Sequence, residues 1–225
     1  MAGVVLSAFD VIGPVMVGPS SSHTAGAARI GLAARRLLDD VPTHVRFALH
    51  GSFAATGKGH ATDLALVAGI LGDAPDSETL PRSFERAQAI GLLFEFAAID
   101  LGDEAHPNSV QIEVASAKRL LAMVAASVGG GSIAISAIDG HPVSVSASRP
   151  TLVCWHTDRA GFLAALTALF AKNSLNIVAS TTSRKTRGGA ALTVIEIDDT
   201  PSATIARDAA QLPDMTRVVL LAPLP

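Results

Sequence analysis

The order of apolar segments after residue 150 limits the possible folds of this chain most strongly. Four short apolar segments predict strands, and two segments with apolar residues at helical spacing predict helices between them. Thr157 or Asp158 is a candidate cap for the first helix, and Pro201 a candidate first residue of the second. The resulting order, βαββαβ, is that of a ferredoxin-like two-layer sandwich. The predicted strands are Thr151–Trp155, Asn176–Thr182, Ala191–Ile197 and Met215–Leu221, and the first helix runs through Phe162, Leu166 and Phe170.

Residues 1–148 predict a separate α+β domain with a mixed or antiparallel sheet. A stretch of small polar residues with a proline, Ser144–Pro150, reads as the linker to a second domain over residues 151–225. Residues 118–126 fit a helix or a strand equally well. The expected helices are Thr24–Leu38, His60–Leu71 and Pro81–Leu92, and the expected strands are Val45–Leu49, Val110–Ala115 and Ile133–Ile138.

Composition excludes several classes of function. The net charge of −3 and the lack of basic runs argue against a nucleic-acid partner. No apolar stretch reaches the roughly 20 residues that span a bilayer, and the N-terminus lacks the basic region of a signal peptide, so we expect a cytoplasmic protein. The mean hydropathy of +0.41 is nevertheless high, as expected where another subunit covers part of the surface. The one cysteine, Cys154, forms no internal disulfide and cannot hold an iron–sulfur cluster alone.

The segment Gly18-Pro19-Ser20-Ser21-Ser22-His23-Thr24 is the strongest candidate for a site. Gly-Pro turns the chain, and three serines then enter a predicted helix. A helix N-terminus presents unpaired N–H groups and a positive dipole end, which favour a carboxylate or phosphate. The simpler interpretation is that one serine caps the helix and His23 faces solvent. A cap requires a single hydroxyl, so the remaining serines and the histidine favour a binding role.

Two further segments contain candidate residues. Residues 50–63 predict a glycine-rich loop between a strand and a helix, with Lys58 and His60 in it, but without the spacing of a phosphate-binding P-loop. In His106-Pro107-Asn108, Asn108 can bind a ligand or simply form a turn. His23, His60 and His106 lack the spacing that pre-arranges metal ligands, so we expect no metal on this chain. No nucleophile elbow is present, which argues against a hydrolase.

Taken together and in this order, these segments and Ser127-Val128-Gly129-Gly130-Gly131 resemble the β-chain domain of iron–sulfur L-serine dehydratases. Asp158-Arg159-Ala160-Gly161 and Asn176-Ile177 resemble an ACT domain, a ferredoxin-like module that often senses amino acids. ACT helices commonly begin with Asp-x-Pro-Gly, and here Ala160 replaces the proline, so binding of an effector does not follow from the resemblance.

The resemblance implies a lyase subunit that converts L-serine to pyruvate and ammonia, in amino-acid degradation and gluconeogenesis. The 4Fe–4S cluster would belong to a partner α subunit, and this chain alone would be inactive. Two alternatives stay open, an amino-acid-sensing regulatory module and a scaffold for homodimers. The implied roles are proton transfer or substrate orientation for His23 and His60, and substrate binding for Ser20, Ser21, Ser22, Thr24, Lys58 and Asn108.

Overall fold

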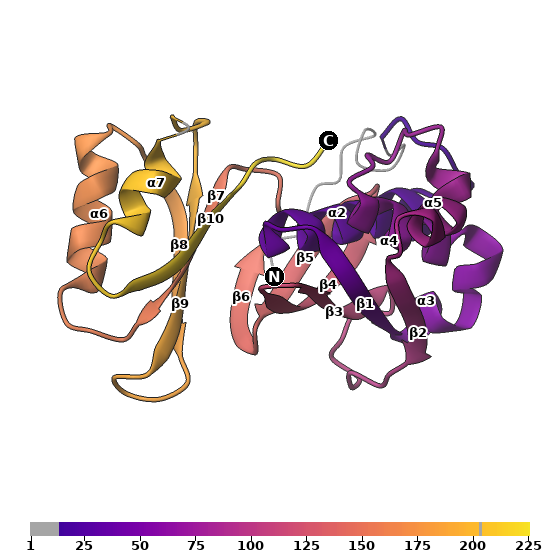
Figure 1. Ribbon diagram of the computed structural model, residues 1–225, viewed down its shortest axis with the longest axis horizontal. Coiled ribbons are helices and arrows are strands. Elements are labelled where there is room, and N and C mark those ends of the chain that lie inside the picture. The colour runs from indigo at the N-terminus through magenta and orange to yellow at the C-terminus, as the bar shows by residue number, and fades with distance from the viewer. Residues whose placement is uncertain (1–13, 203) are drawn as a thin grey trace, which may run out of the picture. The chain divides into compact units, whose positions relative to one another are not determined.

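The computed structural model describes residues 14–202 and 204–225. The chain divides into two compact units, residues 1–135 with Pro225, and residues 136–224 (Figure 1). Each unit is described by itself below. The domain limits 1–148 and 151–225 stay a prediction. None of the helices in the described ranges is long and apolar enough to cross a membrane.

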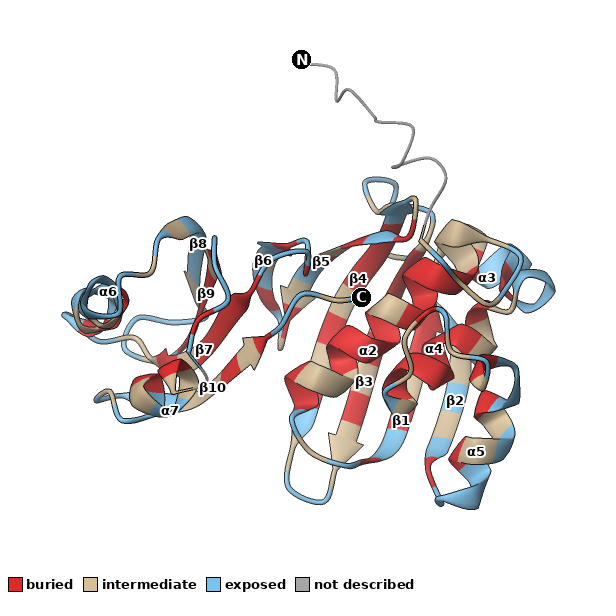
Figure 2. Cartoon of the chain, turned by 90° about the horizontal axis from the view of Figure 1, so that it is seen from above, coloured by how far each residue is buried: buried red, intermediate tan, exposed pale blue. Residues whose placement is uncertain are grey.

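Helices α2 and α4 of the first unit are rich in alanine and glycine and are mostly buried, whereas α3 and α5 are largely exposed. Figure 2 shows α2 and α4 as largely buried helices. The chain enters α2 (Ala27–Leu38) through a π-helical turn, Ser21–Gly26. The remaining helical segments are α3 (Gly51–Thr56), a 3₁₀ turn (Gly57–His60), α4 (Thr62–Leu71), a second 3₁₀ turn (Leu80–Arg82) and α5 (Ser83–Ala89).

The six-stranded sheet has the order β2-β1-β3-β4-β5-β6. Strand β1 pairs in parallel with β2 and antiparallel with β3, and β3 pairs antiparallel with β4, so the sheet is mixed, one of the two arrangements expected. Alternate residues of β3 and β4 are buried, as in a sheet packed on one face, whereas edge strand β2 contains no fully buried residue. The strands are β1 (Pro42–Leu49), β2 (Leu93–Ala98), β3 (Ser109–Ser116), β4 (Leu120–Gly129), β5 (Ser132–Ile138) and β6 (His141–Val145).

Several expected elements are wrong in type or extent. The expected glycine-rich loop over residues 50–63 is helical from Gly51 to His60, because Ser52–Thr56 supply a full turn between the glycines. The helix expected to extend to Leu92 ends at Ala89, and strand β2 follows it. The ambiguous segment is strand β4, and β6 includes the first two residues of the expected linker. Strand β2 was missed although Phe94 and Phe96 alternate with Glu95 along it.

Helices α2 and α4 approach each other closely at two glycines. A Cβ atom on Gly31 would overlap the carbonyl oxygen of Leu66, and one on Gly69 would overlap that of Ala28. Side chains at these positions would therefore strike backbone, which cannot rotate away. The close crossing depends on both glycines.

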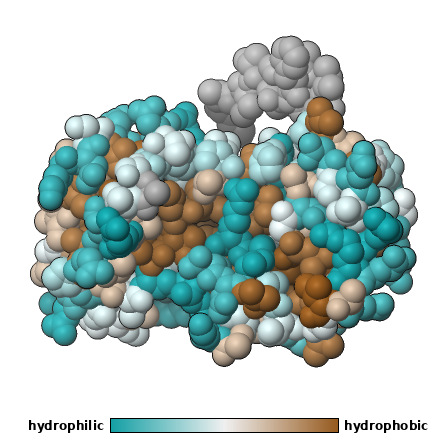
Figure 3. Space-filling view, turned by 45° about the horizontal axis from the view of Figure 1, so that its top comes forward, coloured by the Kyte–Doolittle hydropathy of each residue, from teal (hydrophilic) through white to brown (hydrophobic). Residues whose placement is uncertain are grey.

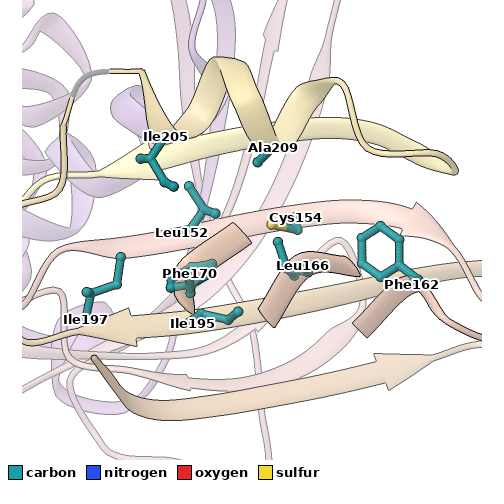
Figure 4. Close-up of a cluster of buried hydrophobic side chains, with 9 residues drawn as sticks. All are labelled: Leu152, Cys154, Phe162, Leu166, Phe170, Ile195, Ile197, Ile205 and Ala209. Carbon is teal, nitrogen blue, oxygen red and sulfur yellow. The ribbon is translucent and has the colours of Figure 1, made fainter. Parts of the chain in front are cut away.

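The second unit contains a four-stranded antiparallel sheet of order β10-β7-β9-β8. With its helices this is the expected ferredoxin-like βαββαβ fold, which is thereby confirmed. Helices α6 and α7 cover the core in Figure 4. The elements are β7 (Thr151–Thr157), α6 (Phe162–Lys172), β8 (Ile177–Arg184), β9 (Ala190–Ile197), α7 (Ile205–Ala210) and β10 (Met215–Leu221).

The start of α6 differs from the expected cap. Neither Thr157 nor Asp158 caps it; the N-cap residue is Gly161, with a φ of 89° and no side-chain cap bond. The Asp158 carboxylate instead accepts hydrogen bonds from Arg184 Nη1 at 2.7 Å and Gly188 N at 3.0 Å. These bonds tie the loop before α6 to the β8–β9 hairpin and hold the pKa of Asp158 below its usual value.

A minority of large apolar side chains remain exposed. On the face in Figure 3, hydrophobic atoms reach the surface in patches between hydrophilic side chains. Such patches can mark contacts with other proteins. The exposed large residues include Val15, Val41, Ile90, Leu93, Leu120, Val128, Leu163 and Val178.

Candidate functional site

The segments singled out in the first unit meet at one end of its sheet. Parallel strands β1 and β2 end there, and the chain leaves β1 directly into α3. Antiparallel β3 begins at the same end and β4 finishes there, since Ser109 pairs with Ala126. Ligand sites in open α/β sheets commonly lie at the carboxyl ends of parallel strands. The topology therefore places these segments together although they span residues 18–131 of the chain.

Backbone contacts hold these segments in place. Ser52 N donates to Pro107 O at 2.7 Å, and this bond joins the start of α3 to the segment His106-Pro107-Asn108. Gly51 has a φ of 56°, and a Cβ there would lie 2.6 Å from Pro107 O, so glycine is required. The carbonyl of Asn108 accepts a bond from Ser127 N at 3.0 Å. Asn108 thus acts through its backbone in this framework, and its side chain is half-buried.

The serine segment forms the N-terminus of a helix, as expected. Ser20 is the N-cap residue, and its Oγ accepts a bond from His23 N at 3.2 Å. Ser20 Oγ also lies 3.4 Å from Ser22 Oγ. The π-helical turn is a rare conformation that is frequent at functional sites. One serine therefore acts as a cap, and Ser21 and Ser22 remain half-buried at the helix start.

His23 is held by hydroxyl groups at both ring nitrogens. Nδ1 lies 3.2 Å from Ser22 Oγ, and Nε2 lies 3.1 Å from both Ser52 Oγ and Thr56 Oγ1. The ring also packs edge-on against Phe53, with centroids 5.4 Å apart. We call His23, His60, Ser22, Ser52 and Thr56 the histidine–hydroxyl cluster. An imidazole fixed in this way is oriented before any ligand arrives.

Ser52 and Thr56 are the site residues that sequence reasoning missed. They lie one helical turn apart on α3, and Thr56 Oγ1 also donates to Ser52 O at 2.9 Å. The spacing of four would have revealed a hydroxyl pair on one helix face, had the segment been predicted as a helix. Reading it as a loop removed that signal.

The other predicted residues lie at different depths. His60 is exposed, with its ring centroid 5.0 Å from that of His23 and its Nδ1 donating to Thr56 O at 3.1 Å. Thr24 is fully buried, and its Oγ1 donates to His60 O at 3.0 Å. The Thr24 hydroxyl therefore joins the two segments rather than facing solvent. Lys58 is exposed on the 3₁₀ turn before His60.

The surroundings of His23 favour its neutral form. Burial, and then the charge of His60, lower the pKa of His23, while the hydrogen bond with Ser52 opposes the shift. A histidine with a pKa below 6.5 is predominantly neutral at physiological pH and can accept a proton. Because the two rings are close, protonating one disfavours protonating the other.

Replacing His60 by glutamine is expected to raise the pKa of His23. The change removes a nearby positive charge, which otherwise disfavours the imidazolium form. Burial remains, so the pKa of His23 should stay below 6.5. Titration of the His23 ring by NMR measures this shift. His44→Gln, at an exposed position of β1, is the control. The interpretation is wrong if both variants shift the pKa of His23 equally or if neither does.

A cleft of about 730 Å³ opens beside the cluster, and we call it the aromatic cleft. It lies against edge strand β2, and residues of α3, the following 3₁₀ turn and α5 also line it. Thr56 and His60 belong to both its lining and the cluster. The apolar lining includes Leu49, Phe53, Phe84, Phe94 and Phe96, and the polar lining includes Thr56, Lys58, His60 and Asp63.

The donor groups of this chain do not fit an iron–sulfur cluster. Over residues 14–202 and 204–225, no three histidine, cysteine, aspartate or glutamate side chains gather closely enough to hold a metal ion. Cys154 is buried in the core of the second unit. Burial raises the pKa of its thiol to about 12, whereas thiolate is the form that binds iron.

Cys154 is accordingly expected to be inert in the folded chain. At pH 8, a pKa of about 12 leaves on the order of 10⁻⁴ of the thiol ionised. Ellman's reagent should detect no thiol in the native protein and one per chain in guanidinium. Rapid reaction of the native protein would show that the second unit opens readily.

Comparison with known proteins agrees with this architecture. Residues 7–92 match the family model of the serine dehydratase β chain, and residues 151–214 match that of the ACT domain. The probable L-serine dehydratase β chain of Bacillus subtilis is 38% identical over 216 residues, covering 96% of this chain and 98% of that protein. The L-serine dehydratase β chain of Peptoniphilus asaccharolyticus is 39% identical over 193 residues, covering 85% and 87%.

A shorter match involves a longer relative. L-serine dehydratase 2 of Escherichia coli is 45% identical over 78 residues, which cover 32% of this chain and 17% of that protein. The two β-chain matches extend over most of both proteins. The chain therefore belongs to the family of L-serine dehydratase β chains, with an ACT domain at residues 151–214. The resemblance inferred from the sequence motifs is confirmed.

Proposed function

We propose that this chain is the β subunit of a two-chain L-serine dehydratase, and that its histidine–hydroxyl cluster completes the L-serine site of the α subunit. The observation that carries the proposal is the convergence at His23. Hydroxyls from the helix start and from α3 hold both its nitrogens, beside a second histidine. Capping the N-terminus of a helix would not by itself require this arrangement.

In this proposal the helix start binds the substrate carboxylate. The N-terminus at Ser20–Ser22 presents backbone N–H groups, serine hydroxyls and the positive end of the helix dipole. Lys58 offsets the carboxylate charge from the neighbouring turn, and Asn108 is a further candidate ligand. Thr24 holds the His60 backbone in place by donating a hydrogen bond from its Oγ1 to His60 O.

One histidine of the pair would accept the Cα proton of L-serine. The reaction removes water from L-serine, and hydrolysis of the resulting imine then consumes water and gives pyruvate and ammonia. One ring must accept the Cα proton. His23 is suited to this by its lowered pKa. Its partner His60 donates through Nδ1 to Thr56 O, which leaves Nε2 as the basic nitrogen.

We place the 4Fe–4S cluster on the α subunit, because the donors of this chain do not fit it. The direct test combines purified α and β chains under anaerobic conditions and measures pyruvate release from L-serine. Pyruvate formation only by the mixture supports the proposal. Equal activity of the α chain alone would overturn it.

The ACT domain favours one alternative, a regulatory module that senses an amino acid. Calorimetry of the isolated chain with L-serine separates the two hypotheses, since tight binding without the α chain favours a sensor. We also propose that the chain is cytoplasmic and forms homodimers, which light scattering tests. A role in amino-acid degradation and gluconeogenesis follows from pyruvate as the product.

A further inference from the structure

We propose that the aromatic cleft is the docking site for an apolar segment of the α chain, the subunit to which we assign the 4Fe–4S cluster. This inference rests on the proposed function, which requires such a partner. It goes further by naming the surface of the β chain that receives the partner and the chemistry of the segment that fits it.

The cleft lies where the layer of helices leaves edge strand β2 partly uncovered. β2 is the end strand of the sheet, and in the described ranges no other strand pairs with its outer edge. Phe94 and Phe96 alternate on this strand, so both rings lie on one face, the face where Phe96 stacks on Phe47 at 4.9 Å. Phe84 of α5 contacts Phe94, with ring centroids 4.9 Å apart.

These phenyl rings are only partly buried. Phe84, Phe94 and Phe96 are all half-buried, although they line a common hollow with residues of α3 and the 3₁₀ turn that follows it. Removing apolar surface from water contributes about 25 cal/mol per Å². Three neighbouring phenyl groups therefore leave a substantial stabilisation to be gained when a second surface covers them.

The substrate is not a suitable occupant. L-Serine carries an ammonium group, a carboxylate and a hydroxyl, which polar lining residues such as Lys58 and His60 can bind but the phenyl rings cannot. The cleft of about 730 Å³ is also far larger than such a small molecule needs. Apolar protein side chains match both its size and its lining, since aromatic residues are enriched in the buried cores of protein–protein interfaces.

Its position identifies the α chain as the partner. Thr56 and His60 line the cleft and also belong to the histidine–hydroxyl cluster. In the proposed function the α chain shares the L-serine site with these residues, so the α chain would lie over the same rim of the cleft. An apolar segment inserted beside the rim would anchor that chain next to the histidine–hydroxyl cluster.

The test uses two exposed alanines that line the cleft, Ala55 on α3 and Ala98 at the end of β2. Ala55→Arg or Ala98→Arg fills the cleft with a charged side chain but removes no buried contact, so the fold should be retained. Ala89→Arg is the matched control, because Ala89 is exposed on α5 and outside the cleft lining. Circular dichroism and thermal unfolding verify that all three variants fold.

Anaerobic interferometry then measures the dissociation constant for the purified α chain, with pyruvate release recorded in parallel. We expect each cleft variant to weaken binding by about tenfold or more and Ala89→Arg to leave it unchanged. An excess of α chain should restore turnover to the cleft variants.

If both cleft variants bind the α chain as tightly as the wild-type chain does, the inference is overturned. The proposed function would still stand in that case, provided that the wild-type chains together form pyruvate. Loss of self-association alone, seen by light scattering, would assign the cleft to a second copy of this chain and also overturn it. Wild-type chain that neither binds the α chain nor supports turnover would overturn both proposals.

Discussion

Replacing Gly69 by alanine is expected to lower the free energy of unfolding of the first unit by about 3 kcal/mol or more. A Cβ at this position overlaps the carbonyl oxygen of Ala28 and approaches the backbone of Leu32 on the facing helix. Helices α2 and α4 must then separate, which opens gaps along the buried contact between them. Domains are stable by only about 5–15 kcal/mol, so this loss is large.

Gly59→Ala is the matched control for this prediction. Gly59 also lies in a helical turn, but a Cβ atom added there would have no atom within 4 Å. The same chemical change should alter stability there by less than about 1 kcal/mol. Urea unfolding followed by circular dichroism measures both variants. Trp155 fluorescence is unsuitable, because the one tryptophan lies in the second unit. Equal midpoints for the two variants would contradict the close helix crossing.

The ferredoxin-like region could be predicted well because its pattern is local. Its short apolar strands differ clearly from its helices, in which apolar residues recur at helical spacing. Phe162, Leu166 and Phe170 of the first helix enter the core as expected. The first unit was harder. Strand β2 depends on pairing with β1, more than 40 residues away, and Phe94 and Phe96 give no local sign of that partner.

The candidate site shows the same limit. The serines and histidines were recognisable because their number exceeds what a helix cap requires. Ser52 and Thr56 were not, because their role depends on the helical conformation of α3 and on its approach to His23. Glycines around this short helix made it look like a loop. Distances between segments, rather than residue types, separate the cluster from isolated caps and turns.

His23→Ala is expected to reduce pyruvate formation by the combined α and β chains by about 10²–10⁴-fold. This is the usual contribution of a positioned general base. Removing the ring also leaves the Ser52 and Thr56 hydroxyls without their shared imidazole partner. Binding of the α chain should be retained, since His23 is not among the residues that line the aromatic cleft.

His44→Ala is the control for His23→Ala. It also replaces a histidine by alanine, but at an exposed position of β1 outside the histidine–hydroxyl cluster. Its turnover should equal that of the wild-type chain. The pattern of kinetic constants then distinguishes the possible roles of His23. A fall in kcat indicates proton transfer, whereas a raised KM with unchanged kcat indicates that the ring orients the substrate. Full activity with both constants unchanged would remove His23 from the catalytic site and leave His60 as the candidate base.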